Sequence, residues 1–136
     1  MRKSFSYSVL KYRPSVFLDE QLNIGVLLTF PLERKVVFIA PSQLNRVEYL
    51  FPDTDTFELQ KLLNQLKKKA YEITLSQQEI SHEALIKVFV ATDFEGLYFS
   101  ERIDGSYQVA EHTVRYYNKM YFEVYREVFR KSVAGS

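Results

Sequence analysis

A polar group stands between two strand-like runs near the start of the chain. Lys11 and Arg13 close the first run, and Glu20, Asn23 and Gly25 open the second. A basic pair can contact an anion, and a carboxylate beside it can act as a general base or orient a ligand. Gly25 removes a side chain, so a ligand or a backbone can approach closely. One interpretation is therefore a small polar site formed by these five residues.

A structural interpretation of the same residues is favoured. Glycine inside a strand usually marks a β-bulge or a close packing contact. In that case Asn23 hydrogen-bonds the turn, and an ion pair between Glu20 and Arg13 holds the hairpin. The catalytic residues, if the chain has any, stay unknown at this stage.

Period-two alternation predicts the strands that position this group. Apolar residues alternate with Ser4, Ser6 and Ser8, which predicts a strand with one polar face that ends near Arg13. The next strand is expected to place Leu22, Ile24, Val26, Leu28 and Phe30 on one face and Asn23, Gly25, Leu27 and Thr29 on the other. Residues 35–40 (KVVFIA) predict a third, covered strand. Together they form a three-stranded antiparallel meander.

Capping residues predict two helices after the meander. Ser42 is expected to cap a short helix that runs to Leu50, and Asp55 with Glu58 resembles a capping pair for a longer one. The longer helix has an apolar stripe that should cover the sheet: Leu59, Leu62, Leu63, Leu66, Ala70 and Ile73.

The segment over residues 78–92 has conflicting signals. Ser76 with Glu79 favours a helix start, whereas Ile86 to Val90 has strand propensity, and we favour a helix. After Gly96, the runs GLYFSE and SYQV predict a weak hairpin that turns at Asp104 and Gly105.

The last helix, from about Glu111 to Lys131, is rich in aromatic residues on more than one side. One apolar face is enough for a monomer's core, and a further apolar surface is normally covered by another chain. Tyrosine is also enriched among interface residues that dominate binding. We therefore expect a protein partner or a homo-oligomer, with these partner-binding candidates: Tyr116, Tyr117, Tyr121, Tyr125 and Phe129.

Two basic groups make nucleic-acid binding an alternative. They are Lys67, Lys68 and Lys69 on one helix turn, and Arg115, Lys119, Arg126 and Arg130 on the last helix. Such groups are usually solvated helix faces. Aromatic rings near Arg115 nevertheless provide surfaces on which bases stack.

Composition excludes several classes of protein. The 136 residues suit one domain, and a formal net charge of +1 favours neither nucleic acid nor membrane as a partner. The absence of cysteine excludes disulfides, thiolate zinc sites and a cysteine nucleophile.

His82 and His112 are expected at the surface, so we expect no metal site. The chain also lacks the glycine patterns of phosphate and dinucleotide loops, and we expect no cofactor.

Targeting signals are likewise missing. The first residues lack the apolar core and cleavage site of a secretory signal, which favours a cytoplasmic location. No apolar run approaches the roughly 20 residues that cross a bilayer, so no membrane association is expected.

The runs YSVLKYRP and DEQLNIGVLL resemble the N-terminal signature of a bacterial family, domain of unknown function 3037. The matching residues are Tyr7, Val9, Tyr12, Pro14, Glu20, Asn23, Gly25 and Val26. Lys11 stands where the family favours Arg, and Asp19 where it favours Gly. The resemblance implies no particular activity. It does imply a HipA-like kinase as partner, because family genes often lie beside such a kinase, in a toxin-type or defence-type system.

These observations predict a single α+β domain over residues 1–131, followed by a disordered tail over 132–136. The domain should contain the meander, two covering helices, the later hairpin and the long C-terminal helix. The leading hypothesis is a small bacterial interaction or regulatory protein that binds a protein partner or itself. The alternatives are a nucleic-acid-binding module and a small metal-dependent hydrolase or nuclease that uses Glu20.

Overall fold

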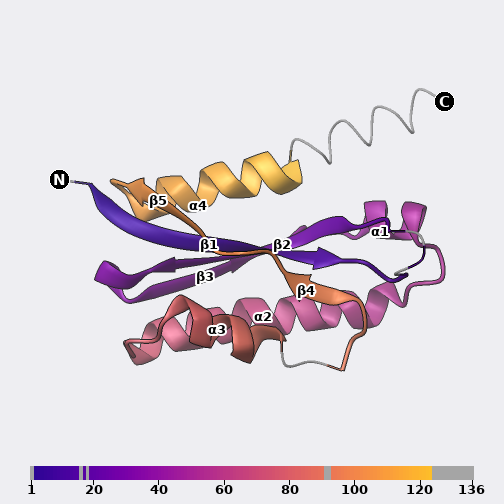
Figure 1. Cartoon of the computed structure of the whole chain (residues 1–136), viewed down its shortest axis with the longest axis horizontal. Coiled ribbons are helices and arrows are strands. Elements are labelled where there is room, and N and C mark those ends of the chain that lie inside the picture. Colours follow the sequence, from indigo (N-terminus) through magenta and orange to yellow (C-terminus); the bar gives the residue numbers. More distant parts are fainter. Residues whose placement is uncertain (1, 16, 18, 91–92, 124–136) are drawn as a thin grey trace.

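A central sheet with helices on both faces organises the chain. The computed structural model describes residues 2–15, 17, 19–90 and 93–123. Strand β1 (Lys3–Tyr12) pairs with β2 (Leu22–Phe30), and β2 pairs with β3 (Lys35–Ile39), in each case antiparallel (Figure 1). The 3-10 turn η1 (Pro31–Glu33) joins β2 to β3. The α+β class and the N-terminal meander are thus confirmed.

Two further strands share the other side of β1. Strand β4 (Leu97–Phe99) pairs with the end of β1, and β5 (Ile103–Tyr107) pairs with its beginning. They do not pair with each other, so the expected hairpin is wrong. Gly105 lies inside β5, opposite Phe5. A Cβ at this position would come within 2.6 Å of the Phe5 ring, so only glycine leaves room for that ring. The sheet therefore has five strands, and β3 forms one of its edges.

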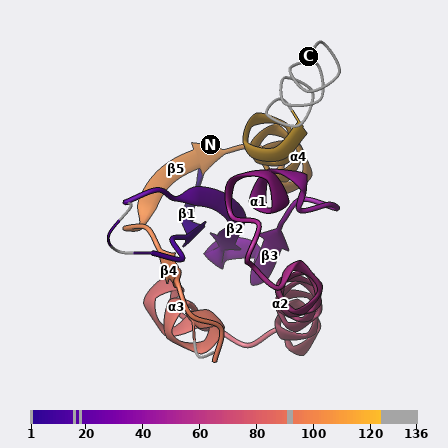
Figure 2. The same ribbon diagram turned by 90° about the vertical axis from the view of Figure 1, so that its right-hand side faces the viewer.

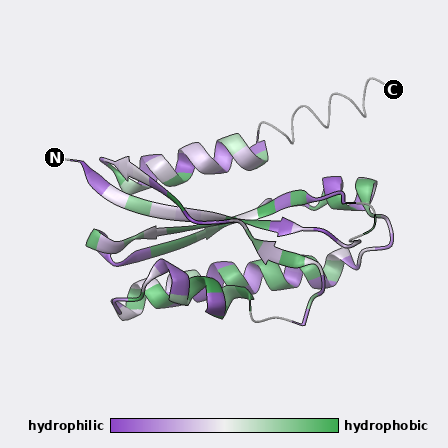
Figure 3. Cartoon of the chain, in the orientation of Figure 1, coloured by the Kyte–Doolittle hydropathy of each residue, from purple (hydrophilic) through white to green (hydrophobic). Residues whose placement is uncertain are grey.

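The helices form a layer on each face of the sheet. Helices α2 (Thr56–Ser76) and α3 (His82–Val90) lie on one face, and α4 (Ala110–Asn118) lies on the other (Figure 2). Helix α4 continues as a π-helical segment, η2 (Lys119–Glu123). The ribbons of α2 and α3 alternate between hydrophobic and hydrophilic residues, as amphipathic helices do (Figure 3). No helix in the described ranges is long and apolar enough to cross a membrane.

A side-chain cap starts helix α2, whereas α1 begins without one. The Asp55 carboxylate accepts a hydrogen bond from the Glu58 backbone N–H at 3.1 Å, which confirms the start of α2. The stripe on α2 is confirmed as well, because it is buried or partly buried against the sheet. Helix α1 (Asn45–Leu50) begins three residues later than Ser42, and no side chain caps it.

The segment between α2 and α3 corrects the predicted start of the third helix. Ser76 is the last residue of α2, and Gln77 ends it in the left-handed conformation, with φ of 54°. Helix α3 is instead capped by Ser81, whose hydroxyl accepts a hydrogen bond from the Ala84 N–H at 3.2 Å. The helical assignment is correct, because Leu85 and Phe89 are one helical turn apart and both are buried against the sheet.

A β-bulge changes the faces predicted for β2. Gly25 lies opposite Leu10, but Asn23 lies opposite Lys11, so Ile24 is the extra residue. Leu22 and Ile24 therefore join the core under α2 and α3. The later apolar residues of the strand, Val26, Leu28 and Phe30, face α4. The expectation that all five share one face is wrong.

Candidate functional site

The bulge brings Lys11 and Asn23 side by side. They are cross-strand partners, and Tyr98 of β4 lies opposite Lys11 on the other side of β1. All three side chains are partly exposed. Because directly opposite residues point to the same face of a sheet, the three form a polar surface at the end of β1.

Gly25 does not belong to this surface. A Cβ on Gly25 would overlap the ring of Phe38 and come within 3.3 Å of the Leu10 Cβ, and both of those residues belong to the core under α2 and α3. Asn23 and Gly25 were expected on one face, and the bulge separates them. The glycine is required by packing of the Phe38 ring, which agrees with the structural interpretation of this position.

The expected ion pair between Arg13 and Glu20 is replaced by another one. Arg13 forms its ion pair with Asp19, at 3.3 Å, and its guanidinium lies 5.6 Å from the centre of the Tyr98 ring. Glu20 is exposed. Asp19 has φ of 53°, a left-handed conformation that aspartate tolerates and glycine favours. Asp19 thus adopts at this position a backbone conformation that glycine would also allow.

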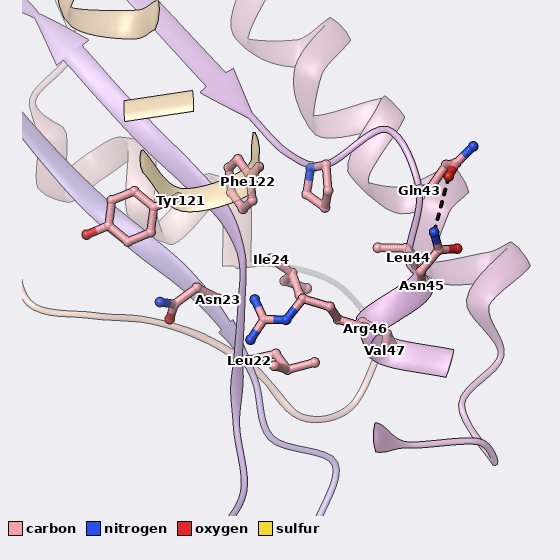
Figure 4. Close-up of a pocket in the computed structure, with 11 residues that line it drawn as sticks. Leu22, Asn23, Ile24, Gln43, Leu44, Asn45, Arg46, Val47, Tyr121 and Phe122 are labelled. Atoms are coloured by element: carbon pink, nitrogen blue, oxygen red, sulfur yellow. Dashed lines mark hydrogen bonds between the residues drawn. The ribbon is translucent and has the colours of Figure 1, made fainter. Parts of the chain in front are cut away.

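A narrow crevice opens beside Asn23. Its walls come from the start of β2, from α1 and from η2, so that Asn23, Arg46 and Tyr121 surround one opening (Figure 4). The apolar part of the lining is Leu22, Ile24, Leu44, Val47 and Phe122. The crevice has a volume of about 40 Å³, room for roughly three water molecules. It can hold a short aliphatic side chain but not a nucleotide or a similar cofactor.

The described part of the aromatic helix packs against its own sheet. The Tyr117 ring lies 4.6 Å from the Tyr7 ring and 5.9 Å from the Phe5 ring, centre to centre, and stacks on Tyr121. Burial raises the pKa of Tyr117 to about 12. Tyr116 points away and is 61% exposed. The other two partner-binding candidates, Tyr125 and Phe129, lie outside the described residues.

The basic candidates do not form one patch. Lys68 and Lys119 are exposed, whereas the ammonium group of Lys69 lies 5.8 Å from the centre of the Phe89 ring. Lys67 and Arg115 come from different helices and line one groove along β3. Arg126 and Arg130 lie outside the described residues.

Sequence reasoning missed a buried polar cluster around His82. This histidine is only 6% exposed, so its expected place at the surface is wrong, whereas His112 is exposed as predicted. The Ser8 hydroxyl lies 2.9 Å from His82 Nε2, and the Thr29 hydroxyl lies 2.8 Å from Nδ1. Burial lowers the pKa of His82, so the ring is neutral at pH 7. Ser8 is 1% exposed, so its hydroxyl is inaccessible, whereas Thr29 and His82 line a pocket of about 290 Å³.

Charged residues extend this cluster to the surface. The Ser6 hydroxyl donates a hydrogen bond to Asp104 at 2.6 Å, and Arg102 forms ion pairs with both Asp104 and Glu83. The cluster thus connects β1, β2, α3 and β5. Its first signal in the sequence is the serine alternation of β1, combined with a histidine on the same helical face as Leu85 and Phe89. Its chemistry is that of a structural network that holds α3 and β5 on the sheet.

Within the described ranges, no group of three or more His, Asp or Glu side chains could hold a metal ion.

Comparison with curated proteins found no match, and comparison with solved structures found none either. A family model does match: its description is "Protein of unknown function (DUF3037)", and it covers residues 7–93. That span runs from the middle of β1 to just beyond α3 and includes Asn23 of the crevice and the buried residues Ser8, Thr29 and His82. The chain therefore belongs to this DUF3037 family.

Proposed function

We propose that this chain is a protein-interaction module, which binds a partner protein or a second copy of itself at the crevice. One observation carries the proposal. Asn23, from the stretch that resembles the family signature, and Tyr121 and Phe122, from the aromatic segment, line the same opening (Figure 4). Two features that the sequence singled out separately are thus parts of one surface.

The shape and chemistry of the crevice support a peptide-like ligand. An apolar floor under an opening of this size suits one aliphatic anchor residue. Amide side chains of Asn23, Gln43 and Asn45 line the crevice; the Asn45 amide donates a hydrogen bond to Gln43, and the Asn23 amide can hydrogen-bond the backbone of a partner. Lys11, opposite Asn23, adds a positive charge that would favour an acidic residue next to the anchor.

The first partner to test is a HipA-like kinase, which rests on the family resemblance alone. Such a pair would work in the bacterial cytoplasm, as part of a toxin-type or defence-type system. A regulatory role follows from this partner, because a small module that covers part of a kinase can change its activity. The second partner to test is another copy of this chain.

Native mass measurement tests the proposal directly. The purified chain is mixed with a HipA-like kinase, and light scattering after gel filtration gives the mass of each species. We expect a complex or a homodimer for the wild type, and its loss in Asn23→Arg, which fills the crevice, and in Tyr121→Glu. Tyr71→Glu is the matched control, because Tyr71 is 64% exposed on α2, which covers the opposite face of the sheet.

Melting temperatures separate lost binding from lost folding. A variant that binds no partner counts only if its melting temperature stays close to that of the wild type. A wild-type monomer that binds no kinase contradicts the proposal, as does a complex that survives both substitutions. Steep salt dependence of DNA or RNA binding would instead support a nucleic-acid-binding module. Metal-dependent turnover that disappears in Glu20→Gln would support a hydrolase or nuclease.

A further inference from the structure

A second surface, away from the crevice, follows the outer edge of β3. It is a groove of about 660 Å³, within the range of roughly 300–1,000 Å³ that is common for ligand sites. Helices α2 and α4 lie on either side of β3 (Figure 2). The lining residues are Lys35, Val37, Phe38, Ile39, Ala40, Lys67, Glu111, Val114, Arg115 and Asn118. Helix α2 contributes one wall through Lys67, and α4 contributes the other wall.

The edge of β3 is closed at one end and open further along. The Thr74 hydroxyl accepts a hydrogen bond from the Val36 N–H at 2.8 Å and donates one to the Val36 carbonyl at 2.9 Å. Residues two apart in a strand direct their backbone groups to the same side, so Phe38 directs its N–H and C=O to this outer edge. Among the described residues, none hydrogen-bonds those two groups of Phe38. An open backbone segment therefore begins directly after the Thr74 contact.

Positive charge surrounds this open segment. Lys35, Lys67 and Arg115 line the groove, and Glu111 is the acidic residue among its lining side chains. Lys67 is partly buried, and burial lowers its pKa, since its charge is incompletely solvated there. A carboxylate in the groove would compensate for that loss of solvation.

We propose that this groove binds a short acidic segment of a partner protein, which adds as an extended strand to β3. The segment pairs with the open N–H and C=O of Phe38, and its acidic side chains contact Lys67 and Arg115. Thr74 limits the pairing to a few residues, because Val36 is already bonded. The inference is independent of the crevice, which lies at a different part of the fold.

The observations favour a peptide over a nucleic acid. Single-stranded nucleic acids bind through phosphate contacts together with exposed aromatic rings on which bases stack. The aromatic residue in the lining, Phe38, is 4% exposed and belongs to the core. An unpaired strand edge, in contrast, recognises the backbone of a polypeptide.

Fluorescence anisotropy with defined peptides tests the proposal. The probe is fluorescein-labelled Glu-Val-Glu-Val-Glu-Val, with Lys-Val-Lys-Val-Lys-Val as its charge-reversed counterpart. We expect the intact chain to bind the acidic peptide only, and Lys67→Glu or Arg115→Glu to weaken binding about tenfold, which corresponds to roughly 1.4 kcal/mol. Lys68→Glu is the matched control, because this neighbouring lysine is exposed and does not line the groove.

Methylated peptides distinguish strand addition from simple charge attraction. A strand pairs through alternate residues, so N-methylation of every glutamate and N-methylation of every valine should have different effects. We expect one series to lose binding by about tenfold or more and the other to keep it. If the two N-methylated series bind with equal affinity, strand addition is contradicted.

The variant Thr74→Ala supplies a gain-of-binding test. It removes both the hydroxyl that pairs with the Val36 N–H and C=O and the methyl group beside it, so a peptide can reach these two groups and the open edge is longer. We expect severalfold tighter peptide binding, from about one additional hydrogen-bonded pair. No binding of the acidic peptide by the wild type, or competition by oligo-uridine that depends on Lys67, would overturn the proposal.

Discussion

Polar side chains differ in solvent exposure between the bulged end and the middle of the β1–β2 pair. At the bulged end, Lys11 and Asn23 face each other at a partly exposed surface that no helix of the described ranges covers completely. In the middle, Ser8 and Thr29 are 1% and 4% exposed, and both hydrogen-bond His82. Lys11 and Asn23, which attracted functional hypotheses, are at the surface, whereas Ser8 and Thr29, from the polar positions of the same strands, are buried.

The difference shows that the polar face of a strand can be either exposed or buried. Which of the two occurs depends on the helices that pack on it. Helix α3 places His82 over the serine side of β1, so hydroxyl groups that would otherwise bind water bind an imidazole. At the bulged end, the extra residue Ile24 turns Asn23 toward the crevice. Stability should therefore depend strongly on the His82 cluster and weakly on the crevice, whereas binding should show the reverse.

The largest effect on stability is expected for His82→Ala. The substitution leaves the buried hydroxyls of Ser8 and Thr29 without their partner, at about 1–3 kcal/mol for each unsatisfied group. We expect a loss of about 3 kcal/mol in the free energy of unfolding, measured by urea denaturation. His112→Ala, at the exposed histidine, is the control. A loss below about 0.5 kcal/mol for His82→Ala would show that the cluster has no structural role.

Gly25→Ala should have the next largest effect. The new methyl group would overlap the Phe38 ring, which is only 4% exposed and has little freedom to move. Overpacking of this kind typically costs about 1–3 kcal/mol, and we expect about 2 kcal/mol by the same denaturation measurement. An unchanged stability together with lost partner binding would restore Gly25 to the functional site.

The pH dependence of stability should depend on His82. Its pKa is lowered by burial in the folded chain, while the unfolded chain has the ordinary value of 6.5. As the pH falls below about 6.5, the unfolded chain therefore takes up a proton that the folded chain does not, and stability decreases. Above that pH this histidine contributes no pH dependence.

Denaturation between pH 7.5 and pH 5.5 measures this decrease. The upper part of the range avoids Glu83 and Asp104, whose pKa values are lowered mainly by hydrogen bonds and whose contributions are lost only at more acidic pH. We expect His82→Gln to remove most of the slope and His112→Gln to keep it. An equal slope in His82→Gln would mean that another group causes the pH dependence.

The smallest effect on stability is expected at the crevice. Asn23→Ala removes a partly exposed side chain, and we expect a change within about 0.5 kcal/mol, while partner binding is lost. Glu20→Ala should likewise leave the melting temperature unchanged. A large destabilisation by Asn23→Ala would mean that this residue, like Gly25, serves the hairpin alone.

Local sequence rules correctly predicted the helices and strands whose capping or periodicity signals involve residues only a few positions apart. The Asp55 cap, the leucine stripe of α2 and the alternation of β1 all depend on residues a few positions apart, and each was found as expected. The later hairpin failed because the turn residues Asp104 and Gly105 pair with distant strand β1. Of the residues grouped in the candidate polar site, Lys11 and Asn23 lie opposite each other, whereas Gly25 faces the core under α2 and α3.

The sequence by itself determined the class of fold, the meander and the position of α2, because period and capping are properties of neighbouring residues. Only the tertiary structure decided which side of each strand is covered. The bulge at Ile24, the burial of His82 and the open edge at Phe38 all arise where segments far apart in the chain compete for the same space or the same hydrogen bonds. Packing and backbone pairing between distant segments have no local pattern, so they become visible only once the chain is folded.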